Sequence, residues 1–202
     1  MNLFFERIAD QLLSNSIAYE DDILPVDVLD ALVNQALLEY QQGEFKEANI
    51  GKGIAKQRIA EVRGDKVLWL NKSQASPHLS QYWSYVDELR LFLSEYFRIH
   101  LERTEMHFAV YPKGAFYTQH LDQFRDHGNR VFSIVLYLNQ KWRVGDGGEL
   151  RIHNADNTFY DIQPIHGRLV VFRSDQILHE VLRTEKPRIS LTGWMHRDPF
   201  II

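Results

Sequence analysis

Apolar side chains recur every three or four residues in three stretches of the first half of the chain. The first covers residues 3–14, the second begins at Pro25 and reaches about Tyr40, and the third covers residues 79–100. Such spacing places the apolar positions on one face of an α-helix. We therefore expect three helices, with residues 17–24 connecting the first two. The third carries an aromatic stripe and is expected to be the main helix that packs against a sheet.

From residue 106 onward the apolar residues form short runs that are separated by turn-forming residues. Runs of this length and composition are typical of β-strands. The strands that we expect are 106–111, 116–122, 131–138, 149–153, 159–163, 169–172, 180–182 and 189–195. Because no helical pattern separates them, they favour a closed or sandwiched antiparallel fold. The glycine-rich segment 145–148 is expected to be a turn and not a phosphate-binding loop, since no helix follows it.

Residues 41–66 break both patterns. Glycines at 43, 51, 53 and 64 interrupt regular structure, and basic residues are scattered among them. A stretch of this kind is by default a solvated surface loop. Long loops in compact domains are also commonly lids or binding loops. We therefore carry both interpretations forward.

Composition narrows the class of protein. The chain has 202 residues, is 45% hydrophobic and has a net charge of −4 with a pI near 6.1. These values fit one folded domain, 1–202, and argue against a phosphate-binding nucleic-acid surface. The absence of cysteine excludes disulfides, cysteine-ligated zinc and a thiol nucleophile. No apolar run is long enough to span a membrane, and the N-terminus lacks a secretory pattern, so we expect a cytoplasmic protein.

Candidate metal chemistry centres on His120 and Asp122. Residues two apart on a strand point to the same face, so these two side chains can bind one ion. His179, which closely follows the run 167–172, is a third candidate ligand. Two histidines and one carboxylate form a facial triad that leaves three octahedral positions open, as in non-haem Fe(II) oxygenases. Alone, a His-x-Asp pair is far more often a surface pair than a metal site.

A candidate carboxylate clamp lies a little further along the chain. Arg188 opens the strand-like run 188–194, and a guanidinium can hold a carboxylate with two parallel hydrogen bonds. An Fe(II) triad followed by such a clamp implies a 2-oxoacid as co-substrate. The remaining histidines, at 78, 100, 107, 127, 153, 166 and 196, are interpreted as surface or hydrogen-bonded residues. His127 and Asp126 are kept as candidates for the mouth of the site.

Together these residues resemble the 2-oxoglutarate and Fe(II)-dependent prolyl hydroxylases, in the branch shared by bacterial protein hydroxylases and animal oxygen-sensing enzymes. The resemblance spans about residues 60–198 and keeps the order of the family's motifs. The matching segments are 63–70 (RGDKVLWL), 111–112 (YP), 117–122 (YTQHLD), 137–139 (YLN), 147–151 (GGELR), 179–181 (HEV) and 188–194 (RISLTGW).

The resemblance implies a fold and a site. The fold would be all-β with flanking helices (α+β): a double-stranded β-helix, or jelly roll, over 104–198, with helical support and a substrate loop in 1–103. The cofactors would be Fe(2+), 2-oxoglutarate and O2, with L-ascorbate (vitamin C) as a further candidate. Tyr137 would join Arg188 at the distal carboxylate of 2-oxoglutarate. Second choices for binding it are Tyr111 and Thr192, and Trp194 is a further cofactor-binding candidate. Tyr111, Tyr137 and Trp194 could equally be core aromatics.

The resemblance also implies a substrate. Bacterial members with the Arg-Gly-Asp-Lys block modify a prolyl residue of a protein such as elongation factor Tu, with conversion of 2-oxoglutarate and O2 to succinate and CO2. Arg63, Asp65 and Arg130 would belong to the substrate loop, with Asp65 as a partner for Arg130. We expect a monomer that binds a protein or peptide. The alternatives are a small-molecule 2-oxoglutarate oxygenase, a nucleic-acid demethylase, which the acidic charge disfavours, and a non-catalytic binding module.

Overall fold

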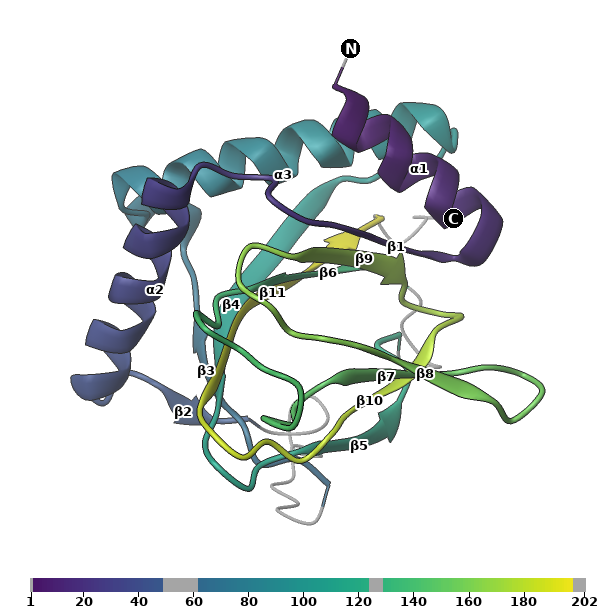
Figure 1. The fold of residues 1–202 in the computed structure, drawn as a ribbon. Helices are drawn as coiled ribbons and strands as arrows, with labels where there is room; N and C mark the ends of the chain where they lie inside the picture. The colour runs from purple at the N-terminus through teal and green to yellow at the C-terminus, as the bar shows by residue number, and fades with distance from the viewer. Residues whose placement is uncertain (1, 49–61, 124–128, 198–202) are drawn as a thin grey trace, which may run out of the picture.

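The computed structural model describes residues 2–48, 62–123 and 129–197 (Figure 1). Its helices are α1 (Leu3–Asn15), α2 (Val26–Gln41) and α3 (Pro77–Tyr96), with a short 3₁₀ helix η2 (Lys72–Gln74). Its strands are β1 (Ile17–Glu20), β2 (Lys46–Glu47), β3 (Lys66–Trp69), β4 (Arg103–Tyr111), β5 (Tyr117–His120), β6 (Arg130–Tyr137), β7 (Leu150–His153), β8 (Phe159–Ile162), β9 (Leu169–Arg173), β10 (Leu178–Val181) and β11 (Arg188–His196).

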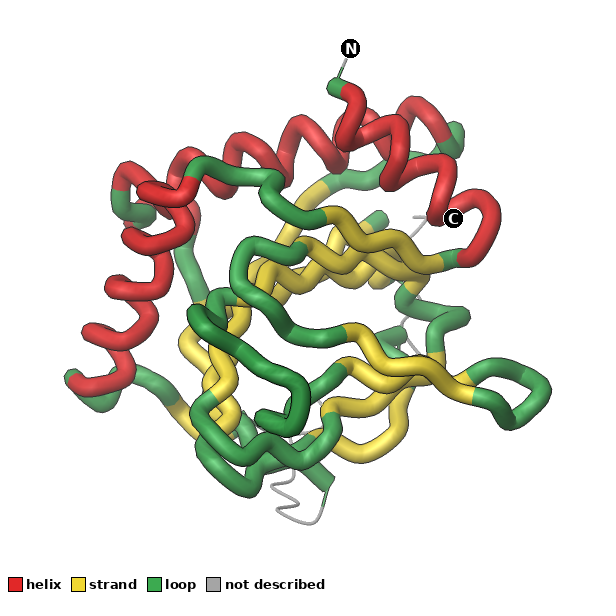
Figure 2. The backbone as a smooth tube through the Cα atoms, viewed as in Figure 1, coloured by secondary structure: helices red, strands yellow, loops and turns green. Residues whose placement is uncertain are grey.

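Two antiparallel sheets form the core, as Figure 2 shows in yellow. The larger sheet has the order β1-β9-β6-β11-β4-β3-β2, and the smaller has the order β5-β10-β7-β8. In the larger sheet, β11 pairs with β4 along nine residues on one side and with β6 on the other. This pairing makes β11 the central strand of the wall that faces the smaller sheet.

Alternation along the strands divides the larger sheet into two faces. One face packs its apolar side chains under the helices, where Phe108, Phe132 and Leu191 are fully enclosed. The opposite face points to the smaller sheet and carries Tyr137 and Phe172. Because successive side chains on a strand point to opposite faces, the same strands that bury the core also present a second row of residues to the space between the sheets.

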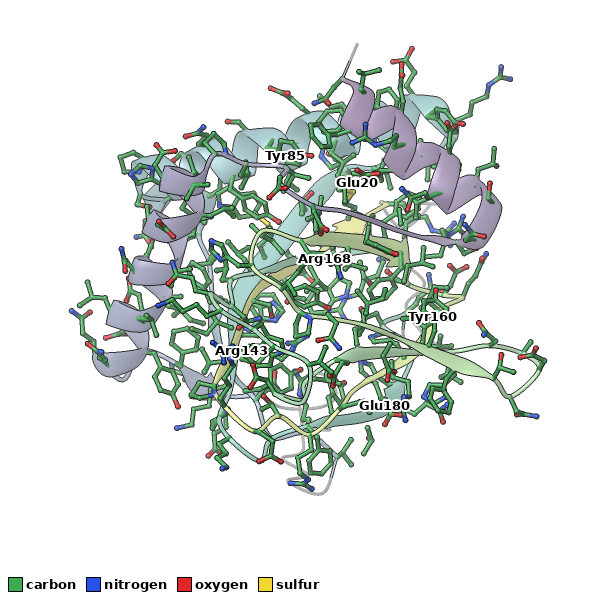
Figure 3. All side chains as sticks on the ribbon, in the orientation of Figure 1. Glu20, Tyr85, Arg143, Tyr160, Arg168 and Glu180 are labelled. Carbon is green, nitrogen blue, oxygen red and sulfur yellow. The ribbon has the colours of Figure 1, made fainter. Side chains whose placement is uncertain are left out.

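The helices cover the outer face of the larger sheet, and local signals set their ends. The Asn2 side chain accepts a hydrogen bond from the backbone N–H of Phe4 at the start of α1, and the helix stops at Ser16 with φ 61°. Ser76 caps α3 and Pro77 follows it, a favoured first helical residue. At the far end of β1, Glu20 accepts hydrogen bonds from α1 and lies near Tyr85 of α3 (Figure 3).

The predicted fold is confirmed: the jelly-roll core is antiparallel, and each of the eight expected strands overlaps an observed one. The third helix was predicted too long, because Phe97 ends it and Arg98 adopts a left-handed φ of 53°. The segment 17–24 is not a simple connection, since β1 pairs with β9. Strands β2 and β3 take up parts of the expected 41–66 loop, whose residues 49–61 lie outside the described residues. None of the described helices is long and apolar enough to cross a membrane.

Candidate active site

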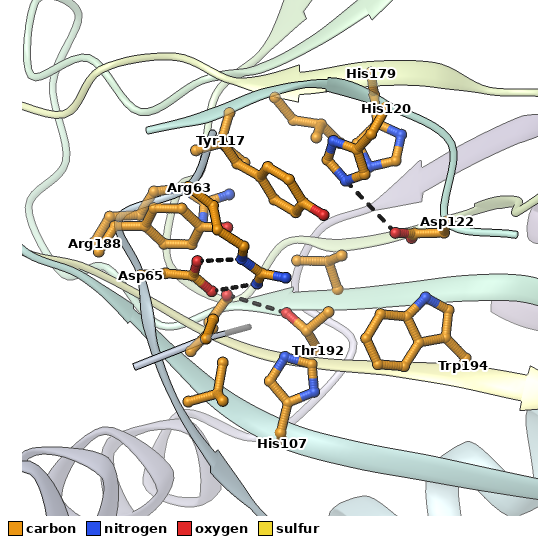
Figure 4. A pocket seen from close by; sticks show the side chains of 18 of the residues that line it. Arg63, Asp65, His107, Tyr117, His120, Asp122, His179, Arg188, Thr192 and Trp194 are labelled. Carbon is orange, nitrogen blue, oxygen red and sulfur yellow. Dashed lines mark hydrogen bonds and ion pairs between the residues drawn. The ribbon is translucent and has the colours of Figure 1, made fainter. Parts of the chain in front are cut away.

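His120, Asp122 and His179 converge at one end of the space between the sheets. His120 ends β5 and pairs in register with His179 on β10, so the two imidazoles sit side by side with ring centroids 4.3 Å apart. Asp122 follows two residues later, with Oδ1 3.6 Å from Nε2 of His120. One ligand atom from each side chain lies within 4.8 Å of the others. The three side chains are therefore close enough to hold one metal ion (Figure 4).

Backbone contacts orient both imidazoles in the same way. Nδ1 of His120 lies 2.7 Å from the carbonyl oxygen of Thr118, and Nδ1 of His179 lies 2.9 Å from that of Ile177. A carbonyl can only accept, so each Nδ1 carries the proton and each Nε2 keeps its lone pair. Burial lowers the pKa of His179 to about 4, which keeps it neutral at physiological pH. Both rings thus carry a proton on Nδ1, the tautomer that leaves Nε2 for a metal.

The carboxylate of Asp122 is held by a serine pair that no sequence pattern indicated. Ser133 Oγ donates to Oδ2 of Asp122 at 2.6 Å and lies 2.8 Å from Ser174 Oγ. Burial alone would raise the pKa of Asp122, but the neighbouring His120 and His179 and the hydrogen bond from Ser133 keep it well below its usual range. Since Ser133 occupies Oδ2, the other oxygen is left to face the two histidines.

Arg188 lies in the same pocket, on the opposite sheet. Its side chain is buried, and its Nε donates to the Gly148 carbonyl at 2.8 Å. The guanidinium carbon lies 4.9 Å from the ring centre of Tyr137 and 5.0 Å from that of Tyr111. Burial raises the pKa of both phenols, so each hydroxyl stays protonated. This end of the pocket therefore combines a fixed cation with hydrogen-bond donors.

A tight turn fixes the position of Arg188. Gly148 has φ +68°, and a Cβ there would lie 2.9 Å from Cδ of Arg188. Only glycine therefore combines this backbone conformation with room for the arginine stem. The segment 145–148 is a turn, as expected, and its last glycine belongs to the candidate site through the Gly148 carbonyl.

The predicted partnership of Asp65 with Arg130 is wrong, because Arg63 takes that place. Nε and a terminal nitrogen of Arg63 bind the two carboxylate oxygens of Asp65 at 2.7 and 2.6 Å, and the guanidinium lies over the Tyr117 ring. Arg130 instead reaches Glu105 at 3.2 Å. Arg63 lies only two residues from Asp65, so forming this ion pair orders little of the chain. Its two parallel hydrogen bonds to the carboxylate therefore form in preference to a pair with the distant Arg130.

Arg130, Trp194 and their neighbours form the outer end of the same wall. The Arg130 guanidinium lies 3.5 Å over the Trp194 ring and donates to the backbone oxygen of Asp122. Glu105 also pairs with His196 at 3.0 Å. Although burial opposes ionisation, His196 and Arg130 lower the pKa of Glu105 to about 2. The arginine therefore links the aromatic wall to the segment that carries Asp122.

The cavity between the sheets has a volume of about 920 Å³ and brings most of the predicted site residues together. Its lining includes His120, Asp122, His179, Arg188, Tyr137, Tyr111, Thr192, Trp194, Arg63, Asp65 and Arg130. It also includes His107 and Trp69. His107 is 4% exposed and Nδ1 of its ring has no hydrogen-bond partner among the described residues, so its interpretation as a surface or hydrogen-bonded residue is wrong. His127 and Asp126 lie outside the described residues.

A model of the 2OG-Fe(II) oxygenase superfamily matches residues 106–196. A prolyl-4-hydroxylase from Pseudomonas putida has a solved structure that is 38% identical, with a TM-score of 0.88, over 96% of this chain and 100% of that one. A prolyl hydroxylase from Trichoplax adhaerens, solved with a peptide fragment of the hypoxia inducible factor oxygen degradation domain, is 26% identical with a TM-score of 0.84. That match covers 96% of this chain and 89% of that one.

A curated relative, prolyl 3-hydroxylase OGFOD1 of Xenopus laevis, is 28% identical over 121 residues. The match covers 54% of this chain, and the chain spans only 23% of that relative's length. A jelly roll that holds two histidines, an aspartate and a buried arginine in one pocket defines the class of 2-oxoglutarate-dependent oxygenases. The chain belongs to the 2OG-Fe(II) oxygenase superfamily and is a prolyl hydroxylase-like dioxygenase.

Proposed function

We propose that this oxygenase hydroxylates a prolyl residue of a protein, with His120, Asp122 and His179 as its iron ligands. The observation that carries the proposal is that the three converging side chains and the buried Arg188 line one cavity from opposite sheets. That arrangement gives the metal and a dicarboxylate separate attachment points. The prolyl hydroxylases among the relatives support the choice of substrate.

The donor set fits Fe(II). Two imidazole nitrogens and one carboxylate oxygen are the donor set with which non-haem Fe(II) oxygenases hold their metal. When bound there, iron supplies the chemistry that couples the conversion of 2-oxoglutarate and O2 to succinate and CO2 with hydroxylation of a C–H bond. The chain itself fixes the ligands: the Thr118 and Ile177 carbonyls set the imidazole tautomers, and Ser133 holds Asp122.

Arg188 is proposed to bind the distal carboxylate of 2-oxoglutarate, with Tyr137 as a second donor. The Tyr137 hydroxyl is enclosed and makes no hydrogen bond of ordinary geometry within the described residues, and the Arg188 guanidinium lies over its ring. A carboxylate oxygen would satisfy this hydroxyl as well as the guanidinium. Tyr111 contributes a second ring beside Arg188, and Thr192 and Trp194 line the wall further out. L-ascorbate is proposed only as an accessory reductant.

The target that we propose to test first is elongation factor Tu. Purified factor and a host lysate would each be incubated with enzyme, Fe(II) and 2-oxoglutarate, and peptides would be searched for a gain of one oxygen on proline. The proposal expects this gain with wild type and its loss with Asp122→Ala. Hydroxylation of free proline without any protein product would instead assign the chain to the small-molecule oxygenases.

A further inference from the structure

The wall formed by β4 and β11 carries a regular series of pocket residues. Arg188 pairs in register with Tyr111, and Thr192 pairs with His107. The four residues from Arg188 to Thr192 rise by about 13 Å at the usual strand spacing of about 3.3 Å. A five-carbon diacid held at Arg188 is shorter than this distance. The level of Thr192 and His107 therefore lies in the part of the cavity beyond the proposed co-substrate.

At this level His107 is a buried polar ring between aromatic surfaces. Its ring centroid lies 4.8 Å from that of Trp69 and 5.2 Å from that of Trp194, with the second pair stacked. Nδ1 of His107 is enclosed and has no hydrogen-bond partner among the described residues. The opposite edge of the ring, which carries Nε2, points into the pocket beside Thr192 (Figure 4).

The surroundings of His107 indicate where its proton lies. Burial lowers the pKa of His107 to about 4, so the ring is neutral at physiological pH and carries a single N–H. An enclosed N–H without a partner is rarer and costlier than an enclosed lone pair. Nδ1 therefore holds the lone pair, and Nε2 carries the hydrogen. His107 presents one hydrogen-bond donor to the cavity.

We propose that His107 is a substrate-positioning residue whose Nε2–H donates a hydrogen bond to a main-chain carbonyl oxygen beside the target proline. A prolyl residue has no backbone N–H, so the polar main-chain groups around it are mainly carbonyl acceptors. A donor on an aromatic wall matches an apolar ring that is flanked by carbonyls. This inference rests on the proposed function, in which the substrate is a prolyl residue of a protein. It adds that the enzyme recognises a carbonyl group of the polypeptide backbone next to that proline.

Substitutions at His107 can distinguish the roles of its two ring nitrogens. The amide of His107→Gln reaches about as far as Nε2, the amide of His107→Asn reaches only about as far as Nδ1, and His107→Phe keeps the ring without a donor. With purified elongation factor Tu as substrate, we expect KM to rise about tenfold for His107→Phe and His107→Asn, the size of one neutral hydrogen bond. We expect His107→Gln to stay within about threefold of wild type. His78→Phe and His78→Gln, on the exposed surface of α3, are the matched controls.

The KM for the protein substrate should rise, whereas the KM for 2-oxoglutarate should not, because the donor lies beyond the co-substrate. A variant that disturbs the whole pocket would raise both. Equal KM values for the Phe, Asn and Gln variants and wild type would overturn the proposal, and so would rescue by Asn but not by Gln.

A spectroscopic test does not depend on the target. Long-range ¹H–¹⁵N spectra of histidine-labelled enzyme, loaded with Zn(II) and 2-oxoglutarate under anaerobic conditions, distinguish protonated from unprotonated ring nitrogens. The signal assigned by comparison with His107→Phe should show protonated Nε2 and bare Nδ1 at pH 7. The capped probe N-acetyl-proline-N′-methylamide should shift that Nε2–H signal.

These two experiments distinguish failure of the substrate proposal from failure of this inference. If wild type oxidises no protein prolyl residue, the proposed function fails. The inference about His107 then fails as well only if the capped probe does not shift the His107 Nε2–H signal. Protein hydroxylation with an Nδ1–H tautomer, or with no shift on adding the probe, would overturn the role of His107 alone.

Discussion

Ser133 orients a proposed metal ligand, because its hydroxyl donates a hydrogen bond to Oδ2 of Asp122 at 2.6 Å. Ser133→Ala should free that oxygen to rotate and weaken Fe(II) binding by about 10- to 100-fold, the usual effect of removing a partner of a metal ligand. Titration of the apoenzyme with Fe(II) under anaerobic conditions measures this change directly.

Ser190→Ala is the matched control for that measurement. Ser190 is also buried and lies on the same pocket wall, but its hydroxyl bonds to Thr192 at 3.2 Å and not to a proposed ligand. The Fe(II) dissociation constant should stay close to wild type in this variant. Unchanged Fe(II) affinity in Ser133→Ala would show that the serine is not needed to orient the carboxylate.

The buried ring of His107 should make stability depend on pH. Burial lowers its pKa from the ordinary histidine value of about 6.5 to about 4 in the fold. Between these two pKa values the unfolded chain binds a proton at His107 and the folded chain does not. The free energy of unfolding therefore decreases as the pH falls from about 6.5 to about 4. The contribution is full above about pH 6.5, and at most about 3 kcal/mol of it is lost by pH 4.

Urea unfolding of wild type and His107→Phe from pH 7 to pH 4 checks this effect. Wild type should lose more stability across the window than the variant does. Burial also lowers the pKa of His179 to about 4, and this residue remains in both proteins. The plot of stability against pH should therefore be shallower for the variant but not flat. Parallel curves would mean that His107 takes up a proton in the folded state as readily as in the unfolded one.

At the scale of elements, the turn before β7 determines where the carboxylate clamp sits. Gly145 and Gly148 both have positive φ, but a Cβ at Gly145 would meet nothing within 4 Å, whereas at Gly148 it would lie 2.9 Å from Arg188. Alanine at either position should cost about 1 kcal/mol of stability through backbone strain. Only Gly148→Ala should also displace Arg188 and weaken 2-oxoglutarate binding, by roughly tenfold or more.

Calorimetric titration with 2-oxoglutarate under anaerobic conditions compares the two alanine variants. The difference between them reports what a Cβ at position 148 meets, chiefly Arg188 at 2.9 Å and then Thr184 at 3.2 Å, because the strain is common to both. Similar affinities for 2-oxoglutarate in both variants would indicate that the arginine stem adjusts without moving its guanidinium.

The segment that leads into β3 is hydrogen-bonded to the start of β5, and both line the cavity. Gly64 N–H donates to the Phe116 carbonyl at 2.9 Å, and Arg63 holds Asp65, whose side chain has 0% exposure. Arg63→Ala should reduce the free energy of unfolding by about 3–5 kcal/mol, because it leaves a buried carboxylate without its partner. The double variant Arg63→Ala/Asp65→Ala should lose less than the sum of the two single variants.

Chemical denaturation of the four proteins in this cycle gives the coupling free energy of the pair. A surface pair, Arg151 with Asp161, serves as the control because both side chains are at least a quarter exposed, and its coupling should be below about 1 kcal/mol. Additive losses for Arg63 and Asp65 would contradict a buried, mutually dependent pair.

At the scale of the whole molecule, the sequence predicted what depends on local spacing. The helices follow from their apolar period. His120 and Asp122 are close, as residues two apart suggested, although β5 ends at His120 and Asp122 lies just beyond that strand. The sequence did not predict contacts between distant segments, such as β1 pairing Ile17 with Phe172 or Ser133 reaching Asp122. Those contacts depend on the packing of two sheets, which no local pattern contains. The burial of His107 was missed for the same reason.

The same limit explains the error at Asp65. Resemblance proposed a long-range partner, Arg130, whereas the structure uses Arg63, which is two residues away. Both arginines line the cavity, so the sequence identified the correct region but not the pairing. Which cation meets which carboxylate depends on how β3 and β6 are placed around β4 and β11, and that placement belongs to the whole sheet.

The central claim is that one cavity couples conversion of 2-oxoglutarate to hydroxylation of a protein prolyl residue. The most direct measurement is a reaction of the enzyme with elongation factor Tu and host lysate proteins under ¹⁸O₂. Mass spectrometry should find one heavy oxygen on a prolyl residue and one in succinate, both lost in His179→Ala. Succinate formed without any protein prolyl product, or a product oxygen drawn only from water, would contradict the account.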